Sequence, residues 1–534
     1  MASLRCCHKI SRRRLPMGQE TFPAEYKPIS DKKALAADIY GNRFHADQTL
    51  YEYLIEFLLI FVSGDDDKIN PKEKLRFHSP DAIGNLSYTV EPRMGLKRFI
   101  FFDCNKKDDA IQIDRDAYTH LIDALKKKFA DYTDDSQKMS VLEALQDLLH
   151  GYAVILKKRT WCAQAMLPLC PELIFCEAMP KKKERGRMVW KDYKNDEEKE
   201  RRKIDSNFDF TKRNFLSRGG VLYYLHLLQG MKGQEDKRAT LEYLLQEQLV
   251  EHGKKMSQIA NFVQDTWEEY MGYSTHPNVK INISFIPEAA YKDVAGDSVD
   301  ELINFMSCEM HPVNKIELLA KGIMIQVLRM LSAATAVFLN QERECWIMDI
   351  GNMNIEAIKK TAAVNFSHIR GTFTTAIGKN IDVSIAGEER VNRISKARKD
   401  SFDIFKSKGK ELQCIIPTSG PYERFSLPED CIRFLVLALI APGQKMTLDM
   451  FLEKLYRNYR IVIGPVQYRK CSGDDIDTNL ANSFNQNVLS FQELLKATGF
   501  LRELSDATSI VSNPYNKVQK KGGDENAIYN RPNM

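Results

Sequence analysis

Apolar residues recur at helical spacing almost without a break between residues 215 and 340. Side chains at positions i, i+3 and i+4 lie on one face of a helix, and such an apolar face is stable only when it packs against another element. The pattern occurs at 221–228, 241–250, 256–270, 299–310 and 315–339. Strand-forming residues interrupt it only near 282–287. The sequence therefore predicts a helical bundle over 213–345.

Length and composition limit the class of protein further. A chain of 534 residues is long enough for several domains, and its 43% hydrophobic and 10% aromatic content is that of a globular protein. It contains no run of about 18 uninterrupted apolar residues, which excludes a polytopic membrane protein. Eleven scattered cysteines without a C-x-x-C pair are typical of reduced thiols. We therefore expect a multi-domain cytoplasmic protein that makes no membrane contact.

One group of cysteines is a candidate metal site. Cys162, Cys170 and Cys176 follow His150, but zinc sites usually present paired ligands two to four residues apart. The alternative is three small side chains buried among apolar neighbours. We favour this alternative and expect neither a metal nor a cofactor.

The first 180 residues are expected to form an arm and a small domain. Residues 1–44 begin with a basic stretch that no apolar segment follows, which excludes a secretory signal peptide and leaves a transit peptide or a basic arm. Helical spacing occurs at 46–63, 114–130 and 137–156, and strand-like runs occur at 86–90 and 98–102. These patterns predict an α+β domain with a small sheet over 45–180.

Two further segments are strongly basic. The stretch 181–203 holds 11 basic and 6 acidic residues, too many charges to be buried. Residues 181–212 are therefore expected to be a solvated charged linker, or a segment that contacts phosphate or a partner. The second basic segment, a predicted amphipathic helix at 387–412, belongs to a mixed region over 346–424. That region also contains a short strand-like run and a predicted helix near 354–363.

The most specific pattern in the chain covers residues 425–515. Helices are predicted at 430–440, 448–459 and 484–498, with a short strand at 461–463, a polar loop at 472–482 and two strands at 500–504 and 509–512. This is the element order of a winged helix, a helix-turn-helix variant whose third helix commonly enters the major groove of DNA. We therefore predict a winged-helix domain at 425–515, followed by a disordered tail at 516–534.

The third predicted helix supplies candidate DNA-binding residues, because Asn and Gln recognise adenine and Lys contacts guanine or phosphate. The candidates are Asn485, Gln486, Asn487, Gln492 and Lys496 on its expected exposed face, with Arg469, Lys470 and Arg502 around it. This helix nevertheless has a single Lys and also carries Glu493, whereas phosphate neutralisation supplies much of the affinity for DNA. A winged helix that contacts only proteins therefore stays an alternative.

The sequence shows no motif of a known catalytic class. It contains no phosphate-binding loop, dinucleotide-binding motif, serine nucleophile elbow, zinc-protease motif or protein-kinase motif. The nearest approach to a Mg²⁺-dependent nuclease is Asp349 after a short strand, with Glu356 and Lys359 downstream at the wrong spacing. The other interpretation is that Asp349 caps the asparagine-rich turn that follows it.

Three stretches carry a resemblance to known proteins: 96–102 (LKRFIFF), 214–225 (NFLSRGGVLYYL) and the predicted helix pair at 426–465. Together they resemble the large accessory subunits of multi-gene bacterial phage-defence loci, with the methylation-associated defence system first and the phosphorothioation-dependent restriction systems second. The resemblance implies sister subunits such as an ATPase, a methyltransferase or a nuclease. It implies no site residues.

The sequence therefore predicts a mainly α protein with small β elements, an α+β chain of several domains. Its predicted function is that of a non-catalytic subunit of a bacterial defence complex, which binds DNA and partner subunits. The alternatives are a Mg²⁺-dependent nuclease subunit and a scaffold that binds only proteins.

Overall fold

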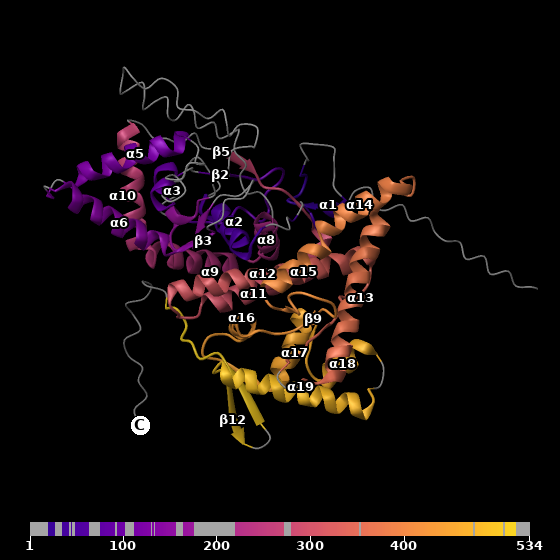
Figure 1. Ribbon diagram of the computed structural model, residues 1–534. Helices are drawn as coiled ribbons and strands as arrows, with labels where there is room; N and C mark the ends of the chain where they lie inside the picture. Colours follow the sequence, from indigo (N-terminus) through magenta and orange to yellow (C-terminus); the bar gives the residue numbers. More distant parts are fainter. Residues whose placement is uncertain are drawn as a thin grey trace, which may run out of the picture.

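The computed structural model describes residues 20–26, 35–41, 44, 48–63, 75–90, 93–101, 112–129, 131–132, 134–155, 164–175, 219–271, 279–351, 354–473, 476–505 and 508–519. In these ranges the chain is mainly helical and its strands form small sheets of two or three members, as the sequence predicts (Figure 1). One hydrophobic cluster extends from Phe22 to Val511 and joins most of the elements.

Helix α12 (Pro312–Leu339) lies at the centre of the fold and is buried along most of its length. Pro312 begins it, where a missing N–H costs no hydrogen bond, and Asn340 ends it in the left-handed conformation. It packs against α2 (Leu50–Ser63), α11 (Glu288–Met306) and α16 (Glu429–Leu439). By length and composition α12 is apolar enough to cross a membrane, but 83% of its most apolar window is buried inside the protein, as in a core helix.

The described part of the first 271 residues contains further helices. They are α1 (Leu35–Tyr40), α3 (Met94–Ile100), α5 (Gln112–Lys128), α6 (Asp135–His150), α8 (Gly219–Gly230), α9 (Glu235–Gln246) and α10 (Lys254–Met271), with a 3₁₀ turn at Pro171–Leu173 and a π turn at Glu247–Glu251. Of these helices, α3, α5, α6 and α10 pack against one another. The antiparallel strand pairs are β1 (Thr21–Phe22) with β6 (Ile286–Pro287), β2 (Ser87–Val90) with β5 (Val279–Asn282), and β3 (Ala153–Ile155) with β4 (Ala165–Met166). The predicted strands near 86–90 and 282–287 are thus confirmed.

The strand predicted at 98–102 is wrong, because residues Met94–Ile100 form helix α3. Its apolar residues 96, 99 and 100 are buried at helical spacing, a pattern that a short continuous apolar run does not distinguish from a strand. Gly95 lets this helix approach α10, since a Cβ there would lie 2.5 Å from the Cβ of Trp267. Contact with a distant helix therefore decides the local conformation.

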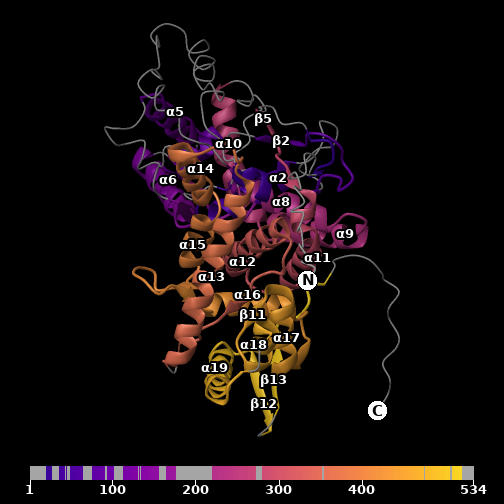
Figure 2. The same ribbon diagram turned by 90° about the vertical axis from the view of Figure 1, so that its right-hand side faces the viewer.

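Helices α13 (Glu356–Asn380), α14 (Gly387–Lys399) and α15 (Phe402–Glu411) form a column on one side of the molecule (Figure 2). The helix predicted near 354–363 extends over 25 residues as α13, about 37 Å at 1.5 Å per residue. The basic helix predicted at 387–412 is two helices instead of one. The chain breaks at Ser401, whose buried hydroxyl donates to the carbonyl of Ala397.

The last part of the chain has the predicted helices and hairpin, and additional elements. Its elements are β7 (Trp346–Ile347), β8 (Ile415–Ile416), β9 (Arg424–Phe425), α16, β10 (Lys445–Thr447), α17 (Leu448–Tyr459), β11 (Ile461–Val462), α18 (Pro465–Ser472), α19 (Thr478–Ala497), β12 (Leu501–Ser505) and β13 (Thr508–Ser512). Strands β10, β13 and β12 form an antiparallel sheet in that order, and β11 pairs in parallel with β7.

Two boundaries in this part differ from the prediction. Helix α19 begins at Thr478, before the predicted start near 484, because the Asp477 side chain accepts a hydrogen bond from the N–H of Leu480. Residues 516–519, which the prediction places in a disordered tail, are hydrogen-bonded to the rest of the protein: the carbonyl of Asn516 accepts from Glu309 N–H, and Val518 N–H donates to the carbonyl of Ser307. The charged segment at 181–203, most of the predicted N-terminal arm and residues 520–534 lie outside the described residues.

Candidate functional site: helix α19 and the basic face of α13, α14 and α15

The predicted DNA-binding residues on α19 do not share one exposed face. Asn485 and Gln486 are exposed, as predicted. Gln492 is half-buried and its Nε2 donates to Ser509 Oγ at 3.3 Å, which ties the helix to β13. Two of the five candidates on this helix are therefore fully available to a ligand.

Asn487 is a correction to the predicted exposed face, because only 1% of it is accessible. Its Oδ1 accepts from the N–H of Ile350, and its Nδ2 donates to the carbonyls of Met348 and Ile463, all at 3.0–3.1 Å. The residue lies on the same helix face as the buried Phe484 and Phe491. Its side chain thus satisfies backbone groups at the end of the β7–β11 pair and is unavailable to DNA.

Lys496 is half-buried and already paired with two acids. Its Nζ lies 2.9 Å from Glu493 and 2.7 Å from Glu503. The hydrogen bonds that Lys496 donates to Glu503 and Glu493 raise the pKa of this lysine above its ordinary value. Its charge is balanced within the protein, so it offers little net attraction to a phosphate.

The remaining candidates lie on α18 and β12. Arg469 and Arg502 are exposed, whereas Lys470 is paired with Glu453 at 2.7 Å. Residues 425–515 as a whole contain nine basic and ten acidic side chains. Their exposed large apolar side chains are Met450, Val466 and Leu489, which are 60%, 55% and 51% accessible. This part of the surface is almost neutral and partly apolar.

Asp349, the residue of the nuclease alternative, is buried and has two partners. Its Oδ2 accepts from Arg424 Nε at 2.7 Å, and its Oδ1 accepts from the N–H of Gly351 at 3.0 Å. The carboxylate caps the turn after β7, as the second interpretation of the sequence predicts. Glu356 and Lys359 lie on α13. Across the described ranges, no group of three or more His, Cys, Asp or Glu side chains is arranged to hold a metal.

A cluster of cations on α13 and α15 surrounds one buried acid, Glu423. Arg370 Nη2, Lys406 Nζ and Lys410 Nζ lie 2.8, 2.7 and 2.6 Å from its carboxylate. Burial alone would raise the pKa of Glu423, but hydrogen bonds from Lys406 and Lys410 hold it below the ordinary value. The cluster therefore carries three positive charges against one negative charge.

The cations of this cluster remain partly open to solvent. The side chains of Arg370, Lys406 and Lys410 are 48%, 34% and 19% exposed, while that of Glu423 is 5% exposed. Segment 356–412, which contains α13, α14 and α15, holds 12 basic and 7 acidic residues. We call the exposed cations of these three helices the basic face.

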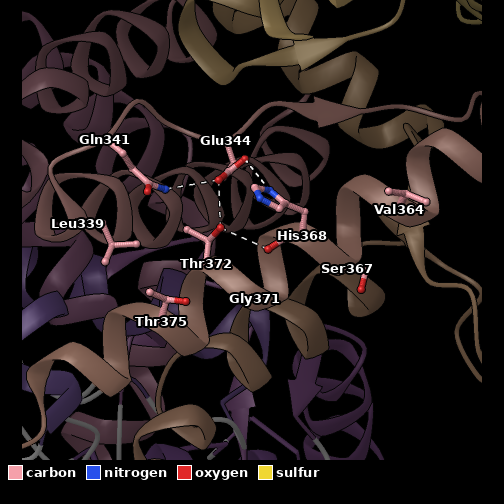
Figure 3. A pocket seen from close by; sticks show the side chains of 9 residues that line it. All are labelled: Leu339, Gln341, Glu344, Val364, Ser367, His368, Gly371, Thr372 and Thr375. Atoms are coloured by element: carbon pink, nitrogen blue, oxygen red, sulfur yellow. Dashed lines mark hydrogen bonds and ion pairs between the residues drawn. The ribbon is translucent and has the colours of Figure 1, made fainter.

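A shallow hollow of about 710 Å³ adjoins α13 on another side (Figure 3). Ser367, Gly371 and Thr375 of α13 form one wall, and the chain that follows α12 forms the other. Glu344 lies in it, where it accepts from Thr372 Oγ1 at 3.0 Å and faces His368 Nδ1 at 3.2 Å. The hollow thus has an acidic centre and lies beside the basic face.

The sequence could not identify the Glu423 cluster. In the sequence, Glu423 follows Lys410 by 13 positions and Arg370 by 53 positions, so no local spacing pattern connects the acid with its cations. The one available sign was the basic composition of 387–412. Cys170 of the cysteine group is buried, in agreement with a structural role for that residue, while Cys162 and Cys176 lie outside the described residues. No protein-family model, no curated protein and no solved structure matches this chain.

Proposed function

We propose that this chain is a non-catalytic subunit that binds DNA and partner proteins, and that residues 425–515 form a winged-helix domain. The observation that carries the proposal is the order of elements in this domain: helix α16, strand β10, helix α17, the short strand β11, helices α18 and α19, then the β12–β13 hairpin. The sheet order β10–β13–β12 is that of a winged helix, with one additional helix, α18. This fold serves recognition of DNA and of proteins.

The resemblance of three sequence stretches to accessory subunits of bacterial phage-defence loci supports a place for the chain in such a complex. In this proposal the protein acts in the cytoplasm beside sister subunits such as an ATPase or a methyltransferase. DNA binding would bring those subunits to their substrate, and the chain itself would carry out no chemical step.

Fluorescence anisotropy with a labelled 30-base-pair duplex tests the DNA half of the proposal. We expect binding at 50 mM salt, with an affinity that falls steadily through 100 and 200 mM, because each protein–phosphate contact releases a counterion. A protein that leaves the duplex unbound at 50 mM salt would contradict this half. Affinity without dependence on salt would contradict it as well.

A second candidate, a scaffold that binds only proteins, is favoured by the surface of the C-terminal domain. This domain is almost neutral, and it exposes Met450, Val466 and Leu489. Co-purification of sister subunits from the native host, carried out with nuclease and 1 M salt, distinguishes the two. Partners that remain attached, together with absence of duplex binding, would support the scaffold.

A further inference from the structure

We infer that the basic face of α13, α14 and α15, and not α19, holds the phosphate backbone of the DNA. This inference rests on the DNA-binding role proposed above and names the surface responsible for it. Phosphate contacts require cations whose charge the protein does not itself cancel. The two surfaces, α19 with its neighbours and the basic face, therefore differ in how many of their cations already form ion pairs with acids of the protein.

On α19 and its neighbours two of the four candidate cations are already paired with acids. Lys496 is shared between Glu493 and Glu503, and Lys470 is bound to Glu453. Of these candidates Arg469 and Arg502 remain, one on α18 and one on β12, within a domain whose acids outnumber its bases. These two arginines alone offer few phosphate contacts, whereas a duplex-binding protein can make about six to ten.

On the basic face the pairing is incomplete. Arg370, Lys406 and Lys410 share the single carboxylate of Glu423, which leaves two positive charges uncancelled beside partly exposed side chains. Among the described residues, the exposed lysines of α14 without an ion pair are Lys396 and Lys399. The excess of five basic residues in 356–412 equals the net charge of the whole chain.

The shape of the face suits a duplex backbone. Ala397 is the one buried residue of α14, so this helix presents most of its circumference to solvent. Beside Arg370, the outer side of α13 carries Thr374, which is exposed and short. Hydroxyl groups donate to phosphate oxygens, and small side chains allow close approach. The length of α13, about 37 Å, is comparable to one helical turn of DNA, about 34–36 Å.

The acid of the neighbouring hollow sets one edge of the surface. Glu344 lies on the side of α13 that carries His368 and Thr372 (Figure 3). Arg370, two residues from each of them on the same helix, lies on the opposite side. A phosphate backbone placed beside Glu344 would meet a negative charge. The surface therefore extends from Arg370 over α15 toward α14 and not into the hollow.

Three variants test the inference by duplex binding at 50, 100 and 200 mM salt. The double variant Lys396→Gln, Lys399→Gln removes two exposed cations that have no ion pair. We expect roughly a tenfold or larger loss of affinity and a decrease of about 2 in the steepness of the salt dependence. Glu423→Gln removes the shared acid and keeps a hydrogen-bond acceptor, so we expect tighter binding. Asn485→Ala, Gln486→Ala on α19 serves as the matched control, with affinity close to that of the unaltered protein.

The opposite signs expected for Glu423→Gln and the lysine variant separate an electrostatic effect from a folding defect, which would weaken binding in both. If the unaltered protein binds DNA and the lysine variant binds with the same affinity and salt dependence, this inference is overturned while the proposed function stands. Loss of DNA binding in the Asn485→Ala, Gln486→Ala variant alone would also overturn this inference while the proposed function stands. If the unaltered protein binds poly-glutamate but no duplex, the DNA-binding function itself is overturned, and the face is one for acidic proteins.

Discussion

Arg329 of α12 and Glu301 of α11 form a bidentate ion pair in the centre of the protein. The Nη1–Oε1 and Nη2–Oε2 distances are both 2.8 Å, and the side chains are 1% and 3% exposed. Helix α17 joins the pair through Asn458 Nδ2 and Tyr459 Oη, which donate to the same carboxylate at 3.0 and 2.6 Å. The Arg329 guanidinium also lies 4.2 Å from the centre of the Tyr459 ring. The ion pair thus connects α17 to α11 and α12.

Removing one member of this pair should destabilise the protein strongly. Arg329→Met leaves the Glu301 carboxylate buried without its cation, and we expect a loss of about 3–5 kcal/mol in the free energy of unfolding. Urea denaturation followed by circular dichroism measures it. The matched control is Arg393→Met, because Arg393 pairs with Glu389 at 2.7 Å on an exposed helix surface. That change should cost less than about 1 kcal/mol. Equal losses in the two variants would contradict the prediction.

Acidification should weaken the same region through His226. Its ring is fully buried and its Nε2 lies 2.7 Å from Ser298 Oγ. Burial, followed by the charge of Arg329, lowers the pKa of His226 from 6.5 to about 3. Between these values the unfolded chain binds a proton that the folded protein does not, so stability falls as the pH falls from 6.5 toward 3. The expected contribution is about 1.4 kcal/mol per pH unit over this window.

His226→Gln removes the titrating ring and keeps a donor near the Nε2 position. Unfolding free energies measured by urea denaturation from pH 7.5 to 5 should depend less on pH in the variant than in the unaltered protein. At pH 7.5, where histidine is neutral in both states, the difference between the two reports only the change in packing. Parallel pH profiles of the two proteins would show that another group is responsible.

Local periodicity was sufficient to predict most helices, because an apolar stripe at helical spacing needs no knowledge of its partner. The wrong prediction at α3 shows the limit of prediction from local periodicity. Residues 96–102 form a short aromatic run that fits a strand equally well, and contact between Gly95 and Trp267 of α10 decides for a helix. That contact spans 172 positions of the sequence.

The candidate site was harder to predict than the fold. Helical phase alone places Asn487 near the boundary between buried and exposed positions, and its polarity suggests exposure. Its burial depends on backbone groups of Met348 and Ile350, which are 139 and 137 residues away in the sequence. The sequence identifies the positive charge of Lys496. It does not show that Glu503, on the following strand β12, lies beside this lysine and cancels part of its charge. Composition counts charges, whereas three-dimensional pairing decides which of them a ligand encounters.

Asn487→Ala should destabilise the protein without acting directly on a ligand. The change leaves the N–H of Ile350 and the carbonyls of Met348 and Ile463 without their side-chain partner, and we expect a cost of about 1–3 kcal/mol. Asn485→Ala, two residues earlier on the exposed side of the same helix, should change stability by less than about 0.5 kcal/mol. Thermal unfolding of the two variants measures the difference. If Asn487→Ala keeps its stability but loses DNA binding, the prediction is contradicted, and Asn487 is part of the surface that contacts DNA.

Two helical glycines should respond in opposite directions to the same substitution. Gly322 lies where α12 meets α16, and a Cβ at this position would overlap Cε2 of Phe434. Because the ring is itself packed against Phe305, at 5.2 Å between ring centres, it has little room to move. Gly322→Ala should therefore cost about 1–3 kcal/mol.

Gly296 lies in α11, where an added Cβ would meet no neighbouring atom within 4 Å. Gly296→Ala should stabilise the protein by up to about 1 kcal/mol, because glycine loses more backbone freedom than alanine when a helix forms.

Denaturation midpoints of the two variants, and of Gly322→Ala combined with Phe434→Leu, measure this difference. The smaller leucine side chain should return part of the stability lost through Gly322→Ala, because the added methyl group and the ring compete for the same space. The coupling between the two substitutions is the decisive quantity. Additive losses would mean that α12 and α16 are not in close contact at this position. Since α16 is the first helix of segment 425–515, the same measurement tests how firmly that segment is joined to the central helix.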